Sequence, residues 1–289
     1  MGHDRCRAPS PSVPDPQRGL HSRRAKDAPT VTAPPAPYLP HPLLPDCGTW
    51  SEVPAGFEVA FTLRAASAIL PGETAPRPDF GRLARALGSA APRFVRTHQE
   101  HGRSIALAND PGAPAPGPCT MVTHPADGLV TDEPRVALAA MGADCPALLV
   151  MDPRTGTCGS AHCGWRGTAL GIARTLLDRL TAEFGSAPAD VHAFIGPGIG
   201  PCCFEVGPEV FDALANAVDG VDRFRRPGPR RDHLDLAGAN RAALEAAGVH
   251  PDRIHDARLC TRCSDGLLFS FRRDGVGTGH HAGIVWRRA

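Results

Sequence analysis

Three side chains with metal-binding chemistry stand in glycine-punctuated stretches of this sequence. His101 lies in Gln-Glu-His-Gly, Cys145 in Gly-Ala-Asp-Cys-Pro, and His162 in Ala-His-Cys-Gly-Trp-Arg-Gly. Two imidazoles and one thiolate are a ligand set for catalytic zinc, in which the metal keeps one position open for water or substrate. If the three converge in space, this protein is an enzyme.

The sequence around each candidate favours a site over a core position. Cys145 lies in a break between two apolar runs, where a side chain can be exposed at the end of a sheet, and His162 closes a predicted strand. If the stretch around His101 is extended, Gln99 shares its face while Glu100 points the other way, because strand residues alternate. Glu100 is then not the natural base for a metal held by His101.

The other cysteines permit different interpretations. Residues 260–263 have the CxxC spacing, and Cys202 and Cys203 are adjacent, so these sulfurs could form a structural zinc site. Because neighbouring cysteines point in divergent directions, this stays the minor interpretation. Redox chemistry at the CxxC lacks the surrounding strand-to-helix context. A free cysteine otherwise behaves as a small buried hydrophobe, which is the interpretation favoured for Cys119, Cys158 and Cys163.

Three other kinds of site lack necessary parts. Residues 98–100 match the His-x-Glu half of the zinc-deaminase signature, but the Pro-Cys-x-x-Cys half is missing. No His-x-His pair occurs, which argues against a multicopper oxidase. The glycine-rich run at 196–200 fails the G-x-G-x-x-G spacing, so no nicotinamide or flavin is expected.

Length and charge restrict the class of protein. The chain has 289 residues and a formal net charge of +1, so it can bury a substantial core and gives no electrostatic reason to expect nucleic acid or an anionic membrane as partner. No apolar stretch reaches the length of about 18 residues that a membrane-spanning helix needs, and no apolar signal core is evident. We therefore expect a cytoplasmic protein with reduced thiols that acts on small polar molecules, as a monomer or a homodimer.

The sequence divides into an extension and a patterned region. Residues 1–47 are rich in Pro, Ala, Arg and Ser, which predicts a disordered extension. Beyond them, a surface loop is predicted at 110–118. Apolar periodicity and capping residues predict helices near 80–87, 169–184, 208–218 and 237–247. Short apolar or alternating runs predict strands near 57–63, 136–141, 147–151, 157–162, 191–195, 267–271 and 283–286.

Several segments together resemble the YfiH-like family, whose members are also labelled laccase-domain or multicopper polyphenol oxidoreductase proteins. The likeness spans about residues 48–286 and holds the motifs in order. The matching segments are Gln99-Glu100-His101-Gly102, 126–131, Ala143-Asp144-Cys145-Pro146, 161–167, 196–207, Cys260-Thr261 and 269–274.

This resemblance implies a fold, a metal and an activity. The fold is a single mixed-sheet α/β domain flanked by helices, covering residues 48–289, in which His101, Cys145 and His162 hold zinc or copper. The implied activity is a purine nucleoside phosphorylase acting on adenosine, inosine, guanosine and methylthioadenosine, with adenosine deaminase activity beside it. The sequence departs from the family pattern at Glu100, at residues 65–67, at Cys163 beside a ligand, and at His280, where arginine is usual.

Phosphorolysis of a nucleoside requires an anion held beside the sugar and stabilisation of a cationic, sugar-like transition state. Arg166 lies at a predicted loop-to-helix junction, where a guanidinium and free backbone N–H groups suit phosphate. A structural arginine paired with a carboxylate is the alternative. Arg272 and Arg273 are adjacent, so one of them should face the site. Arg64 is a weaker candidate for the same task.

Proton transfer and deamination need further groups. A zinc-bound water has a pKa lowered to about 7, which serves hydrolytic deamination at a purine carbon. Asp144 and Glu205 are the candidates for proton transfer, although either could merely cap or orient. Glu205 is also a candidate for substrate binding.

Three other functions are alternatives, and two of them use the same residues differently. Cys145 as nucleophile and His162 as base would make an amide hydrolase, for example one that edits a peptidoglycan precursor. Copper in place of zinc would suit a polyphenol oxidase. A non-enzymatic binding protein would act through the proline-rich extension, although the distinctive residues lie outside it.

Overall fold

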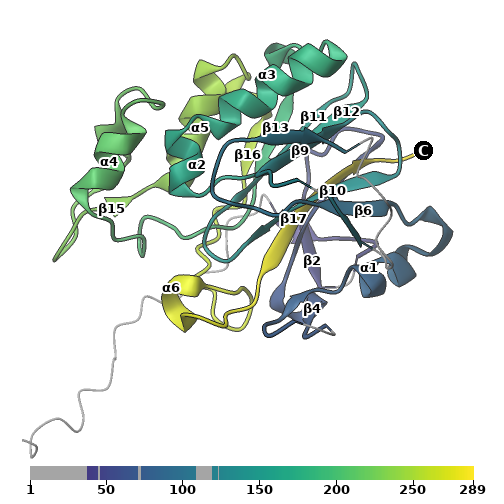
Figure 1. Ribbon diagram of the computed structural model, residues 1–289, viewed down its shortest axis with the longest axis horizontal. Coiled ribbons are helices and arrows are strands. Elements are labelled where there is room, and N and C mark those ends of the chain that lie inside the picture. The colour runs from purple at the N-terminus through teal and green to yellow at the C-terminus, as the bar shows by residue number, and fades with distance from the viewer. Residues whose placement is uncertain (1–37, 45, 71–72, 109–118, 123) are drawn as a thin grey trace, which may run out of the picture. The chain divides into compact units, whose positions relative to one another are not determined.

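The computed structural model describes residues 38–44, 46–70, 73–108, 119–122 and 124–289 (Figure 1). The extension predicted at 1–47 and the loop predicted at 110–118 thus lie largely or wholly outside the described residues. Within that extension, however, β1 (Tyr38–Pro40) pairs antiparallel with β2 (Cys47–Trp50) at the edge of a sheet. The buried His41 ring closes the turn between them by accepting the Leu43 and Leu44 N–H groups at 3.1 Å. The sheet therefore begins ahead of the predicted boundary at residue 48.

Two mixed sheets form the centre of the described chain. The larger has seven strands in the order β1-β2-β3-β17-β10-β6-β8, and the smaller has six in the order β16-β13-β11-β12-β9-β7. Besides β1 and β2, the larger contains β3 (Phe57–Thr62), β6 (Arg93–Arg96), β8 (Cys119–Met121), β10 (Val136–Gly142) and β17 (His281–Arg287). The smaller contains β7 (Ile105–Leu107), β9 (Gly128–Thr131), β11 (Ala147–Asp152), β12 (Thr157–His162), β13 (His192–Ile195) and β16 (Ile254–Asp256).

Six α-helices accompany the sheets in the described residues: α1 (Phe80–Leu87), α2 (Trp165–Ala169), α3 (Ile172–Phe184), α4 (Pro208–Leu214), α5 (Leu236–Ala246) and α6 (Phe271–Asp274). Two short ribbons complete the architecture, β4 (Ser67–Ala68) with β5 (Arg77–Pro78), and β14 (Arg225–Arg226) with β15 (His233–Leu234). The predicted α/β class with a mixed sheet and flanking helices is confirmed, with the strands divided between two sheets. No helix of the described residues is both long and apolar enough to cross a membrane.

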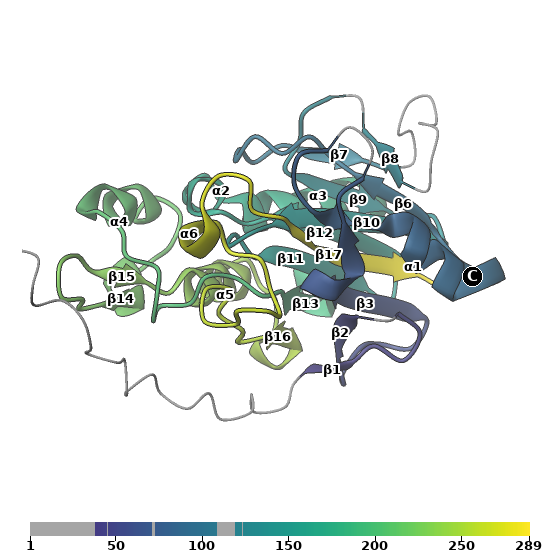
Figure 2. The same ribbon diagram turned by 90° about the horizontal axis from the view of Figure 1, so that it is seen from below.

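The two sheets pack face to face, and helices cover their outer faces (Figures 1 and 2). Alternation along β11 shows the layering, because Leu149 and Met151 belong to the core between the sheets while Leu148 and Val150 pack under α3 and α5. On the other sheet, Phe80 of α1 belongs to the outer core. Since both faces of these strands are buried, their sequences read as continuous apolar runs.

The helix predicted near 169–184 is present as α3 but begins only at Ile172, because Ala169 belongs to the separate helix α2. Gly171 has a φ of +79°, a left-handed conformation that interrupts the helical path between α2 and α3. The strand predicted at 267–271 is wrong. Leu268 and Phe269 are buried as expected of a strand, but Ser270 accepts the Arg273 N–H at 3.2 Å and starts α6. A serine N-cap overrides a short apolar run.

Both loops that carry metal-ligand candidates cross between the sheets. The segment from β10 to β11 contains Cys145, and the segment from β6 to β7 contains His101. His162 is the last residue of β12 and pairs with Ala147, two residues beyond Cys145. The ends of the paired sheets therefore bring the three segments to one place.

Gly283 marks a close approach of the two sheets. A Cβ at this position would lie 2.5 Å from the Ala147 Cβ and 3.3 Å from a Leu149 methyl. We expect Gly283→Ala to lower the free energy of unfolding by about 1–3 kcal/mol, although glycine in a strand is ordinarily unfavourable. Denaturant unfolding checks this, with Gly196→Ala as the control because its Cβ would meet Ala147 no closer than 3.4 Å.

A double variant tests the stated cause. Ala147→Gly removes the atom with which the new methyl collides, so it should cost less in the Gly283→Ala background than in the wild type. A Gly283→Ala protein as stable as the wild type would show that the sheets separate freely at this point.

Candidate metal centre

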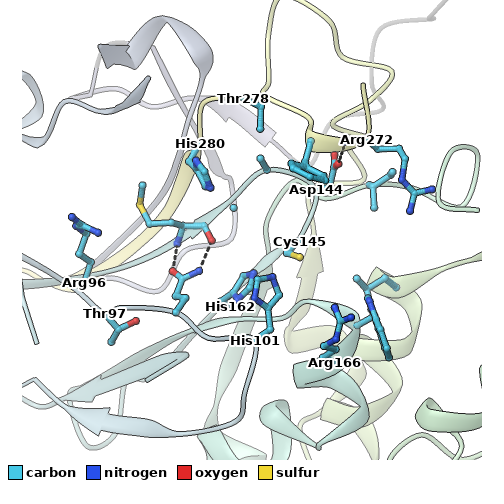
Figure 3. Close-up of a pocket in the computed structure, with 18 of the residues that line it drawn as sticks. Arg96, Thr97, His101, Asp144, Cys145, His162, Arg166, Arg272, Thr278 and His280 are labelled. Atoms are coloured by element: carbon cyan, nitrogen blue, oxygen red, sulfur yellow. Dashed lines mark hydrogen bonds between the residues drawn. The ribbon is translucent and has the colours of Figure 1, made fainter. Parts of the chain in front are cut away.

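The structure brings His101, Cys145 and His162 together. One ligand atom from each lies within 4.8 Å of the others, and the two imidazole rings are nearly perpendicular, with centroids 4.7 Å apart. Figure 3 shows Cys145 beside the His101 and His162 rings. Zinc bonds of about 2.0–2.3 Å to nitrogen and sulfur require ligand atoms about 3.5–4 Å apart, so this donor set fits one ion.

Gly164 leaves the space that this cluster needs. A Cβ there would lie 2.9 Å from the Cys145 sulfur, 3.4 Å from the His101 ring and 3.6 Å from the His162 ring. Any side chain at this position would enter the ligand cluster. The closeness of these three ligand side chains therefore explains why residue 164 is a glycine.

Asp127 is the residue of this site to which the sequence motifs gave no role. Its carboxylate, 2% exposed, lies 3.0 Å from Nδ1 of His162. An ionised carboxylate only accepts, so Nδ1–H donates and Nε2 of His162 is left for a metal. Carboxylates that hold a ligand histidine in this way fix its tautomer and ring orientation. Asp127 directly precedes β9, whose pairing with β12 places it beside His162.

The same carboxylate shapes the loop that carries His101. The backbone N–H groups of Glu100, His101 and Gly102 donate to Asp127 at 3.2, 2.9 and 2.7 Å. His101 adopts a φ of +63°, which turns these amides toward one acceptor. The extended conformation considered for this stretch is therefore wrong, and the strand-parity argument about Glu100 does not apply.

Ionisation in the metal-free site favours a thiolate beside an imidazolium. Burial alone would raise the pKa of the Cys145 thiol, but its interactions with His101 and His162 lower it to about 7. Burial alone would lower the pKa of His162, yet the bonds to Asp127 and Cys145 raise it to about 9. Burial opposes ionisation of Asp127 as well, but hydrogen bonds from His162, Gly102 and Glu100 lower its pKa. A deprotonated sulfur is the form that binds metal.

The three ligands line a cavity of about 570 Å³ that also contains four arginines. Arg166 and Arg272 lie on one side of the ligands and Arg96 on the other (Figure 3), and Arg77 completes the set. Arg77 and Arg96 were absent from the sequence-based candidates, because only the packing of distant segments brings them to the cavity. Arg77 lies 2.6 Å from Nδ1 of His280, so a guanidinium stands beside the residue that replaces the usual arginine.

Two predicted substrate residues do not line this cavity. Arg64 packs its guanidinium over the Phe269 ring at 4.7 Å and lies 3.4 Å from Asp274, at the outer side of α6. The Glu205 carbonyl accepts an Arg272 N–H at 2.9 Å, but its side chain is not part of the lining. Glu205 thus holds Arg272 through its backbone.

Asp144 lines the cavity with both carboxylate oxygens occupied. One accepts the Thr261 hydroxyl at 2.5 Å and the other accepts the Arg272 backbone N–H at 2.6 Å. This carboxylate therefore ties α6 to the loop that carries Cys145. Arg273 points elsewhere and donates to the Thr261 and Leu268 carbonyls at 3.0 and 2.8 Å, so of the adjacent pair Arg272 faces the cavity.

Cys163 and Cys158 are core residues, as expected. Both are 1% exposed, and burial raises the pKa of each thiol. Cys163 packs under α3 rather than toward the cavity, so it adds no fourth ligand to the cluster.

The sequence pattern of one family covers most of the domain. Residues 77–288 match the family described as multi-copper polyphenol oxidoreductase laccase. This chain belongs to that family. The resemblance inferred from the short motifs is thereby confirmed. The described residues offer two groups of side chains able to hold a metal ion, and only the His101, Cys145 and His162 group contains histidine.

Relatives with named activities share this domain. The chain is 39% identical over 211 residues to the purine nucleoside phosphorylase YlmD of Geobacillus stearothermophilus, covering 72% of this chain and 77% of that protein. It is 34% identical over 164 residues to adenosine deaminase RL5 of an unknown prokaryotic organism, covering 56% of this chain and 62% of the relative. The crystal structure of YlmD from Geobacillus stearothermophilus superimposes with a TM-score of 0.76 and 31% identity, covering 88% of this chain and 100% of that one.

Asp127→Asn should weaken metal binding while preserving shape. The amide keeps the size of the carboxylate but loses its charge, so His162 is held less firmly and His101 loses its anchored loop. We expect about a 10- to 100-fold loss of metal affinity, measured by competition with a chelator. Asp152→Asn is the control, because this carboxylate is also fully buried but lies at the far end of β11. Unchanged affinity in Asp127→Asn would contradict the role assigned to Asp127.

Metal-free protein should show a reactive Cys145 near neutral pH. Only the thiolate reacts with iodoacetamide, so the alkylation rate should rise with pH through a midpoint near the Cys145 pKa of about 7. Peptide mass spectrometry separates this thiol from the other cysteines. His162→Ala removes one partner of the thiolate and should move the midpoint upward, whereas an unmoved midpoint would argue against the pairing.

Proposed function

We propose that this chain is a zinc-dependent purine nucleoside phosphorylase. A hydrogen phosphate oxygen forms a bond to C1′ of the ribose while the bond from C1′ to the purine nitrogen breaks, and the proton lost by hydrogen phosphate goes to the departing base. The products are the free base and ribose 1-phosphate, or 5-methylthioribose 1-phosphate from methylthioadenosine. Adenosine, inosine, guanosine and methylthioadenosine are the proposed substrates, with deamination of adenosine as a second activity. The observation that carries the proposal is one cavity containing a His-Cys-His cluster and four arginines. The names of the relatives supply the reaction class.

His101, Cys145 and His162 would hold the metal, with Asp127 fixing His162. Two nitrogens and one sulfur match the donors and the open coordination position of catalytic zinc, and copper is the alternative that the family description suggests. When bound, zinc supplies a positive charge that polarises oxygen ligands, which serves both a phosphate oxygen and the water needed for deamination.

The arginines are the proposed phosphate site. Arg166 is exposed at the start of α2, with its guanidinium 4.4 Å from the centre of the Trp165 ring, which limits its motion and leaves its N–H groups free for a ligand. Arg272 is fixed through the Glu205 carbonyl and packs 5.4 Å from the centre of the Phe204 ring. Guanidinium forks suit phosphate oxygens, and two of them on one side of the metal ligands would orient the nucleophile toward the sugar.

The nucleoside base has an apolar part of the same cavity available. Ile199, Phe204, Leu236 and Phe271 contribute to the lining. Phe271 is 55% exposed, although a phenylalanine of this domain would ordinarily be buried. An exposed aromatic ring at the edge of the cavity is suited to stack on a purine.

Asp144 is proposed to position rather than to transfer a proton. Each of its oxygens already accepts a hydrogen bond, one from Thr261 and one from the Arg272 backbone, and such bonds stabilise the ionised carboxylate and make it a weaker base. The effect of losing Asp144 would then reach the reaction through Arg272, which the carboxylate holds at the cavity.

A Cys-His amide hydrolase is the second candidate, and one observation favours it. The lowered pKa of Cys145 and the raised pKa of His162 describe a thiolate beside an imidazolium, which is an activated nucleophile when no metal is bound. Such an enzyme would act on an amide such as a peptidoglycan precursor. A zinc-bound thiolate is a poor free nucleophile, so metal content separates the two functions.

The decisive experiment is an assay of purified protein of measured metal content. Inosine and adenosine are incubated with and without phosphate, and free base, ribose 1-phosphate and inosine are quantified. Base release should require phosphate and should be lost in His162→Ala and Cys145→Ala. Release of free base at the same rate with and without phosphate would refute phosphorolysis. Cleavage of an amide by metal-free protein, blocked by alkylation of Cys145, would establish the hydrolase.

Arg166→Ala tests the phosphate site. We expect kcat/KM for phosphate to fall about 10- to 100-fold, because a charged hydrogen-bond pair is lost. Arg174→Ala on α3 is the control, since Arg174 is exposed and pairs with Asp178 on the outer face of the domain. An equal loss in both variants would mean that the effect is general rather than local to the cavity.

A further inference from the structure

A second group of cysteines gathers outside the catalytic cavity. The sulfurs of Cys202, Cys203, Cys260 and Cys263 all lie within 4.8 Å of one another. Cys263 lies 3.6 Å from Cys202 and 3.4 Å from Cys203. The argument that adjacent cysteines diverge is wrong here. Residues 201–203 form a turn, closed by the Cys203 and Phe204 N–H groups on the Gly200 carbonyl, that keeps both sulfurs on one side.

We propose that these four cysteines bind a structural zinc ion. A tetrahedral site with zinc–sulfur bonds of about 2.3 Å has its sulfurs about 3.8 Å apart, close to the separations seen here. A disulfide would use one pair and leave the other two thiols crowded beside it. Cys263 approaches two sulfurs at once, which a single ion explains and a single disulfide does not.

The surroundings of the sulfurs suit thiolates. The Gly200 N–H donates to the Cys260 sulfur at 3.3 Å, and the Cys263 N–H also donates to it, across the CxxC turn. The Arg262 side chain hydrogen-bonds to Cys203. Backbone donors and a cation offset the net negative charge of an ion with four thiolate ligands.

The ion would join two segments that build the catalytic cavity. Gly198 and Cys260 form a parallel bridge, supported by the Thr261 N–H on the Gly198 carbonyl at 3.0 Å. On one segment, Ile199 and Phe204 line the cavity, and on the other, Thr261 donates to Asp144. A zinc ion at their junction would fix the wall of the cavity without entering it, so it is a structural site rather than part of the catalytic one.

Metal content tests this proposal independently of activity. Protein purified under reducing conditions with zinc supplied should hold about two zinc ions per chain, one at each cysteine-containing cluster. Cys202→Ser with Cys263→Ser should lose one of them, and His162→Ala should lose the other. Cys119→Ser is the control and should lose neither, since Cys119 lies on β8. A wild type that holds one zinc, lost in His162→Ala, would overturn the proposal.

Three measurements keep the test valid if the double variant folds poorly. Cobalt(II) added to His162→Ala protein that has been stripped of zinc under reducing conditions should give the strong thiolate charge-transfer absorption of a four-sulfur site, and absence of that absorption would refute the site. Peptide mapping without reduction should find all four thiols free after zinc removal, whereas a linked Cys202 and Cys263 in freshly purified protein would establish a disulfide instead. Hydrogen exchange of residues 198–206 should speed up when this zinc is removed, and unchanged exchange would refute its structural role.

Discussion

One buried carboxylate holds the candidate metal centre together. Asp127 accepts from the His162 ring and from three consecutive backbone amides around His101. A buried charge without such partners would be strongly unfavourable, so the interaction determines the loop conformation and the ring orientation at the same time. Two ligands from separate segments thus share one acceptor. The third ligand, Cys145, needs no comparable support because the pairing of β11 with β12 already places its loop beside His162.

The parts that hold the metal ligands and the parts that line the rest of the cavity are built differently. His162 stands at the end of β12, and His101 and Cys145 stand on the two crossovers between the packed sheets, with the His101 loop anchored by Asp127. Much of the remaining lining comes instead from the loop at 196–206, the short α6 and the segment at 278–280. Loops of this kind tolerate change more readily than strands do.

The sequence predicted the parts of the fold whose signals are local. The apolar runs of β10 and β11, the amphipathic pattern of α3 and the position of His162 at a strand end all have short-range signals, and the structure has these elements. The role of Asp127 could not be predicted, because its hydrogen-bond partners lie 25 or more residues away in the chain. Arg77 and Arg96 reach the cavity through tertiary packing alone. β1 was not predicted, because the sequence before residue 48 is rich in proline and has no apolar periodicity. The strand predicted at 267–271 is absent, because Ser270 caps α6 at that point.

The placement of His101 and Cys145 on the two crossovers between sheets would link binding of the proposed metal ion to folding. An unfolded chain presents these donors far apart, so tight coordination waits until both sheets have assembled. Free ion at a hundred times its dissociation constant would then stabilise the native protein by about 2.7 kcal/mol through mass action. A low concentration of the metal in the cell would then lower the stability of the folded protein as well as the activity proposed for it.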